Sequence, residues 1–207
     1  AHRFTMLFTY EHEFFGDYAT KVALFGQANS GRPYSYTFLS DNTNSFNGFT
    51  PFLSAPVQLY VPEGGKLVVN ADGVTTNDPN IQVTPEFAAE VDAFNAYLAA
   101  NDLTDDAGGF AERNGYEGDW WTKFDLKLEQ EFPGALNGHK TAAFLVVDNL
   151  TNLLNDEWGV QRETSFPRTV QIVDASMGTD DAGNPVFVYE DFVPADSQSR
   201  VGSSSLW

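Results

Sequence analysis

Two pairs of carboxylates stand two residues apart along the chain, in positions that could support acid-base chemistry. Glu11 precedes Glu13, and Glu129 precedes Glu131. Residues i and i+2 of an extended strand point to the same side, so each pair shares one strand face, and paired carboxylates are the groups that hydrolyse glycosides. The interpretation we favour is that these carboxylates are simply polar lining residues. We predict no catalytic residue and no enzyme activity.

Other residue types that could bind a metal or act as a nucleophile do not form a recognisable motif. The chain has no cysteine, and His2, His12 and His139 lack the spacing of paired metal ligands. The stretch from Asp41 to Gly48 has oxygen-bearing side chains at alternate positions, as a calcium loop does, but it lacks the closing bidentate glutamate. No phosphate loop, nucleophile elbow or zinc motif is present. We therefore predict no metal site and no cofactor.

The charge balance excludes one class of partner. The 207 residues have a net charge of −18, which argues against nucleic acid, because binding a polyanion needs clustered lysine and arginine. Residues 41–119 contain 13 acids against Lys66 and Arg113, and residues 174–199 contain 6 acids and no base. These stretches are interpreted either as hydrated exposed loops or as an acidic mouth that attracts cations.

Two long segments alternate between apolar and polar residues, and this alternation predicts strands with one apolar and one charged face. In "WWTKFDLKLEQEF", residues 120–132, the apolar side chains fall at every second position; "RFTMLFTYEHEFF", residues 3–15, shows the same pattern. About thirteen residues is long for a strand, since strands in soluble domains usually have about five or six. No run reaches about 18 apolar residues, so no membrane-spanning helix is predicted, whereas a β-barrel remains open.

The rest of the chain supplies partners for these strands and two long intervening segments. We predict an all-β fold, a long antiparallel meander, with strands at about residues 3–15, 18–29, 120–132, 139–150 and 200–207. Short turns at Gly16 and Asp17 and at "PGALNGH" join neighbouring strands. The segments 30–119 and 151–199 are far longer than ordinary loops, which indicates that they have structure of their own.

One helix and one hairpin are expected inside these long segments. Thr84 has the residue type of an N-cap, Pro85 suits the first helical position, and Phe87, Val91, Phe94 and Leu98 fall on one helical face. A short helix over about residues 85–99 follows, ended by Asn101 or Gly108. The turn sequence "GTDDAG" lies between two strand-like segments and predicts a hairpin.

Short turns alternating with long loops are typical of a transmembrane barrel. Twelve steps of about 3.3 Å between Trp120 and Phe132 cover about 40 Å, and a tilt of about 40° projects this to about 30 Å, the thickness of a hydrocarbon layer. Aromatic residues cluster at both ends, as at a membrane interface. The alternative from the same periodicity is a soluble sandwich with one solvated face.

Several stretches resemble a known family in this order: "FTYEHEFFGDYATKVALFGQANSGRPYSYTF", "LYVP", "AERNG", "WWTKFDLKLEQEF" and "AAFLVVDNLTNLLNDEWGV". Together they are similar to the C-terminal part of the barrel of TonB-dependent outer-membrane receptors, most of all to the Oar-like branch. The resemblance covers nearly the whole chain, and "NLTNLLNDEWG" and "RPYSYTF" are its most specific parts. It brings no catalytic motif.

The resemblance implies an incomplete segment of a transmembrane β-barrel in the cell outer membrane of a Gram-negative bacterium. Such receptors take up a ligand with energy from the TonB complex, which contacts a plug domain. The plug and most strands of such a barrel are absent here, and the chain stops at Trp207, so we expect a fragment of a longer protein. Its expected partners are outer-membrane lipid, the TonB complex through the absent N-terminal segment, and an unknown small or peptide-like ligand.

The expected site residues fall into two groups. The resemblance implies that segments 30–119 and 151–199 are extracellular and capture ligand. Aromatic residues of the first segment are therefore candidates for ligand binding: Phe46, Phe49, Phe52 and Tyr60. Each of them could equally pack that segment together. The residues expected to face lipid are Phe4, Met6, Phe8, Phe124, Leu126 and Leu128. The alternative function is a soluble, secreted, acidic all-β binding module that uses the same loops.

Overall fold

The computed structural model describes residues 2–39, 57–136, 138–197 and 199–202. The chain is mostly β, which confirms the predicted all-β class, and it divides into two compact units. We call Ala1–Arg32, Gly118–Glu163 and Gln198–Trp207 the strand unit, and Pro33–Glu117 with Thr164–Ser197 the core unit. Each unit is therefore assembled from segments that are far apart in the sequence.

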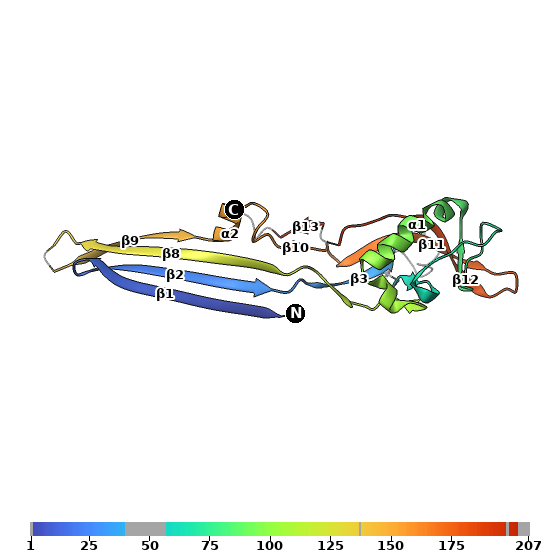
Figure 1. Ribbon diagram of the computed structural model, residues 1–207, viewed down its shortest axis with the longest axis horizontal. Coiled ribbons are helices and arrows are strands. Elements are labelled where there is room, and N and C mark those ends of the chain that lie inside the picture. Colours follow the sequence, from blue (N-terminus) through green and yellow to red (C-terminus); the bar gives the residue numbers. More distant parts are fainter. Residues whose placement is uncertain (1, 40–56, 137, 198, 203–207) are drawn as a thin grey trace. The chain divides into compact units, whose positions relative to one another are not determined.

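The strand unit is built on a four-stranded antiparallel sheet of long strands (Figure 1). Its order is β1, β2, β8, β9, so the four strands lie side by side in the order in which they occur along the chain, with β3 to β7 in other sheets. Gly16, at a φ of 68°, makes the tight turn between β1 and β2, a conformation that glycine adopts without steric cost. The strand bounds are Arg3–Phe15 for β1, Tyr18–Asn29 for β2, Trp121–Pro133 for β8 and Lys140–Val147 for β9.

The end of β9 differs from the predicted strand over residues 139–150. The strand stops at Val147 and a short helix, α2 (Leu150–Leu154), follows. Asn149 lies between them in the left-handed region, at a φ of 50°, and its N–H donates to Asp125 Oδ1 at 2.7 Å. This reversal takes the backbone out of the extended conformation, so the strand cannot continue.

A further strand was predicted over residues 200–207, but the described part of that segment pairs elsewhere. β13 (Arg200–Val201) is two residues long and pairs with β10 (Arg162–Glu163), and residues 203–207 lie outside the described residues. Within the described chain, β1 and β9 are consequently the two open edges of the four-stranded sheet.

The core unit is organised around a five-stranded sheet that draws strands from both predicted loops. Its order is β5, β12, β11, β3, β7. β11 and β12 form the hairpin predicted around "GTDDAG", whereas β3 runs parallel to β11 and β5 parallel to β12, so this sheet is mixed and departs from the predicted antiparallel meander. The bounds are Pro33–Phe38 (β3), Ile81–Val83 (β5), Tyr116–Glu117 (β7), Thr169–Thr179 (β11) and Pro185–Phe192 (β12).

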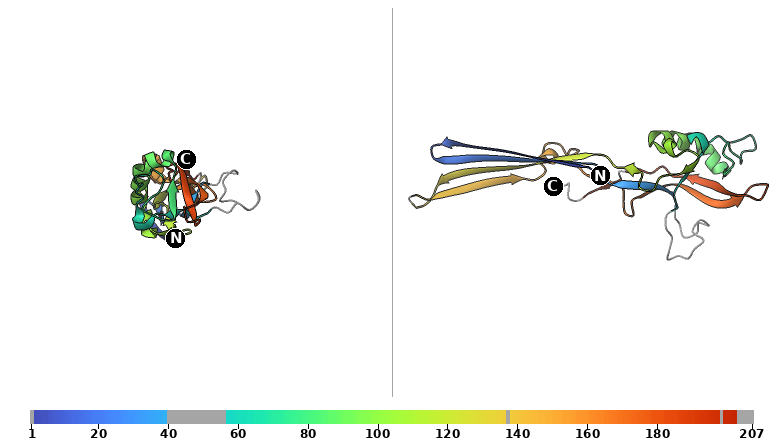
Figure 2. Two further views of the ribbon diagram at one scale, coloured as in Figure 1. Left: turned by 90° about the vertical axis from the view of Figure 1, so that its right-hand side faces the viewer. Right: turned by 90° about the horizontal axis from the view of Figure 1, so that it is seen from below.

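The helix α1 (Pro85–Ala100) packs on this sheet, as Figure 2 shows. Thr84 is its N-cap and Asn101 its C-cap, which confirms the predicted helix. The predicted apolar face is buried, and its rings meet those of β12: Phe94 lies 6.0 Å from Tyr189 and 5.5 Å from Phe192, measured between ring centroids. Smaller elements close the unit: β4 (Tyr60–Val61), β6 (Gly109–Phe110), and the 3-10 helices η2 (Glu63–Gly65) and η3 (Leu103–Asp106).

Replacing Thr84 by alanine should destabilise the core unit by about 1 kcal/mol. Thr84 Oγ1 accepts a hydrogen bond from the N–H of Phe87 at 3.3 Å and donates to the carbonyl of Glu190 at 3.0 Å, and alanine removes both. Six of the eight tyrosines and no tryptophan belong to the core unit, so near-ultraviolet circular dichroism of tyrosine during urea unfolding measures the change. Thr84→Ser keeps the hydroxyl and should behave as wild type, and equal midpoints for all three proteins would refute the capping role.

The buried tyrosines also predict a loss of stability at alkaline pH. Burial raises the pKa of Tyr36 and Tyr189 above the ordinary value, which is about 10. Above that pH the unfolded chain loses phenolic protons that the folded chain keeps, so the stabilisation is complete below about pH 10 and declines as the pH rises further. Urea midpoints should fall steadily above about pH 10. Reversible ionisation of all the tyrosines near pH 10, with the fold intact, would contradict this.

Candidate functional site

The most unusual surface of the described chain is one face of the four-stranded sheet in the strand unit. The pairing keeps side chains of the same kind on the same side, because residues opposite each other in neighbouring strands share a face. Phe8 is opposite Leu24, Leu24 is opposite Leu126, and Leu126 is opposite Val147. The next row on this face is Tyr10, Val22, Leu128 and Leu145. We call this side the apolar face.

The apolar face is open to its surroundings. Every residue of β1 is exposed, and so is every residue of β9 except Val147; Phe4 and Phe8 have 66% and 56% of their surface accessible. An exposed apolar surface of this extent on a soluble monomer is rare and marks a membrane or protein interface. Within the described residues, the strand unit thus buries little of its apolar face.

The register gathers all six residues predicted to face lipid onto this one face. Phe4, Met6 and Phe8 are exposed on the edge strand β1, whereas Phe124 and Leu126, on the inner strand β8, are half-buried. A hollow of about 150 Å³ is lined in part by Met6, Gly26 and Phe124, and the Phe124 ring covers Gly26, which has no side chain. Lipid contact itself stays a prediction.

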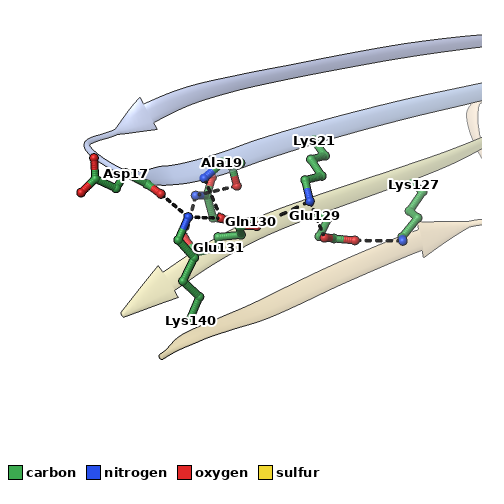
Figure 3. A network of polar contacts seen from close by, with 8 residues as sticks. All are labelled: Asp17, Ala19, Lys21, Lys127, Glu129, Gln130, Glu131 and Lys140. Carbon is green, nitrogen blue, oxygen red and sulfur yellow. Dashed lines mark hydrogen bonds and ion pairs between the residues drawn. The ribbon is translucent and has the colours of Figure 1, made fainter. Parts of the chain in front are cut away.

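The opposite face of the same sheet is charged, and its charges form a connected network (Figure 3). Lys21 Nζ lies 3.5 Å from a carboxylate oxygen of Glu129 and equally far from one of Glu131. Lys127 pairs with Glu129 at 2.9 Å and Lys140 with Glu131 at 3.0 Å. Exposed pairs of this kind contribute little stability one by one, but together they favour the observed register, because a one-residue slip would exchange the two faces.

This network also bears on the two interpretations of Glu129 and Glu131. Glu131 Oε2 accepts a hydrogen bond from Lys140 Nζ and one from the N–H of Ala19, and Glu129 is bound to Lys127. Their oxygens are engaged by lysines and backbone within the sheet. The arrangement favours the polar lining interpretation over a catalytic pair.

Aromatic rings collect at the two ends of β1. Trp120 stacks on Phe4 with ring centroids 5.9 Å apart and on His2 at 6.5 Å. At the other end His12 meets Phe14 edge-on at 4.5 Å. Two of the three histidines therefore contact aromatic rings, and across the described residues no group of three or more histidine or acidic side chains is placed to hold a metal ion.

One strand has a pattern that the alternation did not indicate. β9 is apolar on both sides, so Phe144 and Val146 are exposed on the charged face, with Lys127 Nζ 5.7 Å from the centre of the Phe144 ring. The sequence feature that corresponds to this pattern is the continuous apolar run "AAFLVV". A run of this kind is typical of a strand whose two faces are both covered.

Of the four residues predicted to bind ligand, Tyr60 is the one that lies within the described residues. Tyr60 is buried in the core unit, where its ring stacks on Phe187 at 5.2 Å and its hydroxyl accepts a hydrogen bond from Asn80 Nδ2 at 3.0 Å. This position favours the alternative that Tyr60 packs the segment together. Phe46, Phe49, Phe52 and the calcium-like stretch 41–48 lie outside the described residues.

None of the helices described here has the length and apolar character needed to cross a bilayer. No protein-family model, curated protein or solved structure matches the chain.

Proposed function

We propose that this chain is part of the barrel of a TonB-dependent receptor in the outer membrane, which takes up a ligand with energy supplied through the TonB complex. The observation that supports this most directly is the apolar face, which extends along strands of 12 and 13 residues in β1, β2 and β8 and is exposed throughout β1 and half-buried along most of β2 and β8. At about 3.3 Å per residue and a tilt of about 40°, such strands span a hydrocarbon layer of about 30 Å.

The open edges of the sheet support the same proposal. β1 and β9 each have one edge without a strand partner in the described chain, and unpaired backbone groups cannot remain in lipid because each one costs several kcal/mol. In a barrel, further strands pair with both edges. The charged face with Lys21, Glu129 and Glu131 then lines the lumen, and the apolar face contacts lipid.

The resemblance to the receptor family supplies the rest of the proposal. It implies that the core unit, formed by the segments after β2 and after β9, takes part in ligand capture outside the cell. The net charge of −18 is consistent with a highly hydrated extracellular part.

Flotation with liposomes tests the proposal. The full chain, refolded from urea in the presence of liposomes, should insert as an assembly in which copies pair at the open edges β1 and β9, float with the liposomes, and stay bound after washing with high salt and with alkaline carbonate. A tryptophan signal is available, because all four tryptophans lie outside the core unit, and lipids brominated along their chains should quench part of it. A chain that remains monomeric in plain buffer and does not float would refute membrane insertion.

The second candidate is a soluble, acidic all-β binding module. It is favoured by one observation: the core unit buries a continuous apolar cluster of its own, including Tyr36, Phe87 and Tyr189. The flotation experiment separates the two candidates, since a soluble module has no reason to enter liposomes.

A further inference from the structure

The core unit is strongly acidic, yet two of its three basic residues meet at one cavity. It contains 12 acids between residues 33 and 117 and 6 between 164 and 197, against Lys66, Arg113 and Arg168. Arg113 and Arg168 both line a cavity of about 400 Å³, together with Ser35, Gln58, Asn114 and Thr169. A volume of this size lies within the range of small-molecule sites.

Neither arginine is neutralised within the described chain. The ion pairs formed by the described residues involve Arg32 and Arg200 but leave out Arg113 and Arg168, and no hydrogen bond from either guanidinium is present there. In a unit so rich in carboxylates, pairing would be easy to achieve. Two unpaired guanidinium groups at one cavity are therefore available to an anion from solution.

Ser35 holds the two arginine-bearing turns together. Its N–H donates to the carbonyl of Arg168 at 3.1 Å, and its Oγ accepts a hydrogen bond from the N–H of Asn114 at 2.8 Å. Ser35 is buried and lies opposite Thr169 in the parallel pairing of β3 with β11. The pairing of two distant segments thus brings Arg113 and Arg168 to the same place.

The backbone at this cavity adopts the left-handed conformation twice. Arg168 has a φ of 68°, in a region that a residue with a long side chain seldom occupies, and Asn114 has a φ of 56°, which asparagine tolerates more readily. Such positions persist only where the surrounding structure enforces them, and they concentrate at ligand sites. The hydrogen bonds to Ser35 provide that enforcement at both turns.

Gln58, on the wall of the cavity, has an acceptor that is not used within the described chain. Gln58 Oε1 is buried and has no hydrogen-bond partner among the described residues, while its backbone is fixed by the bridge between Gln58 and Thr37. A buried acceptor left without a donor is costly, and rotation of the Gln58 side chain would bring Oε1 to a ligand hydroxyl or amide in the cavity. The lining therefore combines two guanidinium groups, exposed and unpaired within the described chain, with one acceptor.

We propose that this cavity binds a small hydroxylated oxyanion of the size of a monosaccharide, such as a sugar acid or a sugar phosphate. Guanidinium groups bind carboxylate and phosphate through paired N–H donors, which assigns the anionic group of the ligand to Arg113 and Arg168. Gln58 Oε1 accepts from a ligand hydroxyl. The site uses residues of the core unit alone, so it does not depend on membrane insertion.

Calorimetric titration of the full chain in detergent tests the proposal. The probes are D-glucuronate and glucose 6-phosphate, with glucose as the uncharged control. At least one of the two anions should bind, with glucose at least about tenfold weaker. Arg113→Gln and Arg168→Gln should each lower that affinity at least about tenfold, as expected for losing a hydrogen bond to a charged group. Lys66→Gln removes the same charge elsewhere in the unit and should stay within twofold.

Further variants separate ligand binding from folding and from general charge effects. Arg113→Lys and Arg168→Lys keep the positive charge but lack the planar guanidinium group. They should bind the anion more tightly than the glutamine variants do. Gln58→Met should weaken several-fold the binding of whichever of the two anions binds, but should leave the affinity for sulfate, which has no hydroxyl, within twofold. Tyrosine circular dichroism identifies any variant that does not fold. The proposal would be overturned if glucose bound as tightly as the anions, if neither anion bound, or if Lys66→Gln lost as much affinity as the arginine variants. These outcomes do not depend on the flotation result.

Discussion

Replacing Phe94 by alanine should destabilise the core unit by about 3–5 kcal/mol, the range for removing a large aromatic side chain from a well-packed core. Phe94 is fully buried on α1, and its ring meets Phe87 at 5.3 Å, Tyr189 at 6.0 Å and Phe192 at 5.5 Å. These partners come from both the helix and β12, so a cavity at this position loosens the contact between helix and sheet. A loss of this size is a large fraction of the stability of an ordinary domain.

The measurement is the urea midpoint of the tyrosine signal of the full chain. Val68→Ala is the control, since Val68 has 47% of its surface exposed in the same unit and its truncation should change stability by less than about 0.5 kcal/mol. The tryptophan signal, which comes from outside the core unit, should keep its own midpoint if the two units unfold separately. Equal midpoints for Phe94→Ala and Val68→Ala would show that α1 does not seal the core.

The parts of the fold that could be predicted are those specified by neighbouring residues. The capping residue Thr84, the proline after it and the spacing of Phe87, Val91, Phe94 and Leu98 are all local, and α1 forms where they indicate. The long strands are equally local, because their period of two is visible along a single segment. The predicted hairpin around "GTDDAG" depends on its own turn residues and is present.

The sheet of the core unit could not be predicted in the same way. It is made by pairing β3 with β11 and β5 with β12, segments that are more than 100 positions apart. β3 has six residues and is buried on both sides, and β5 has three, so neither shows an alternation from which a face can be assigned. Both segments were expected to be parts of loops, and their pairing is determined by tertiary contacts.

The candidate sites show the same division. The apolar face follows from alternation, since an unbroken register keeps Phe8, Leu24 and Leu126 together. The anion site has no such signal: Arg113 and Arg168 are distant in sequence and meet only because Ser35 binds both turns. In the sequence Arg113 is one of two bases in an acidic stretch, but no local pattern pairs it with Arg168.

Replacing Phe8 by arginine should lower the stability of the membrane-inserted protein by about 2–4 kcal/mol, the cost of a basic side chain on the lipid face near the middle of a bilayer. Phe8 lies near the centre of β1, on the apolar face opposite Leu24. Folding into liposomes, followed by urea titration of the tryptophan signal and by flotation, measures this cost.

Thr9→Arg is the matched control, because Thr9 is the next residue of the same edge strand, is exposed, and points to the charged face opposite Ala23. It should change stability by less than about 0.5 kcal/mol. Phe8 has 56% of its surface exposed, so replacing it by arginine removes few contacts within the protein. The comparison of the two variants therefore identifies what the apolar face contacts. In water the two variants should therefore behave alike, so a large difference that appears only in liposomes has to come from hydrocarbon. Equal stability of both variants in liposomes would remove lipid as the partner of this face.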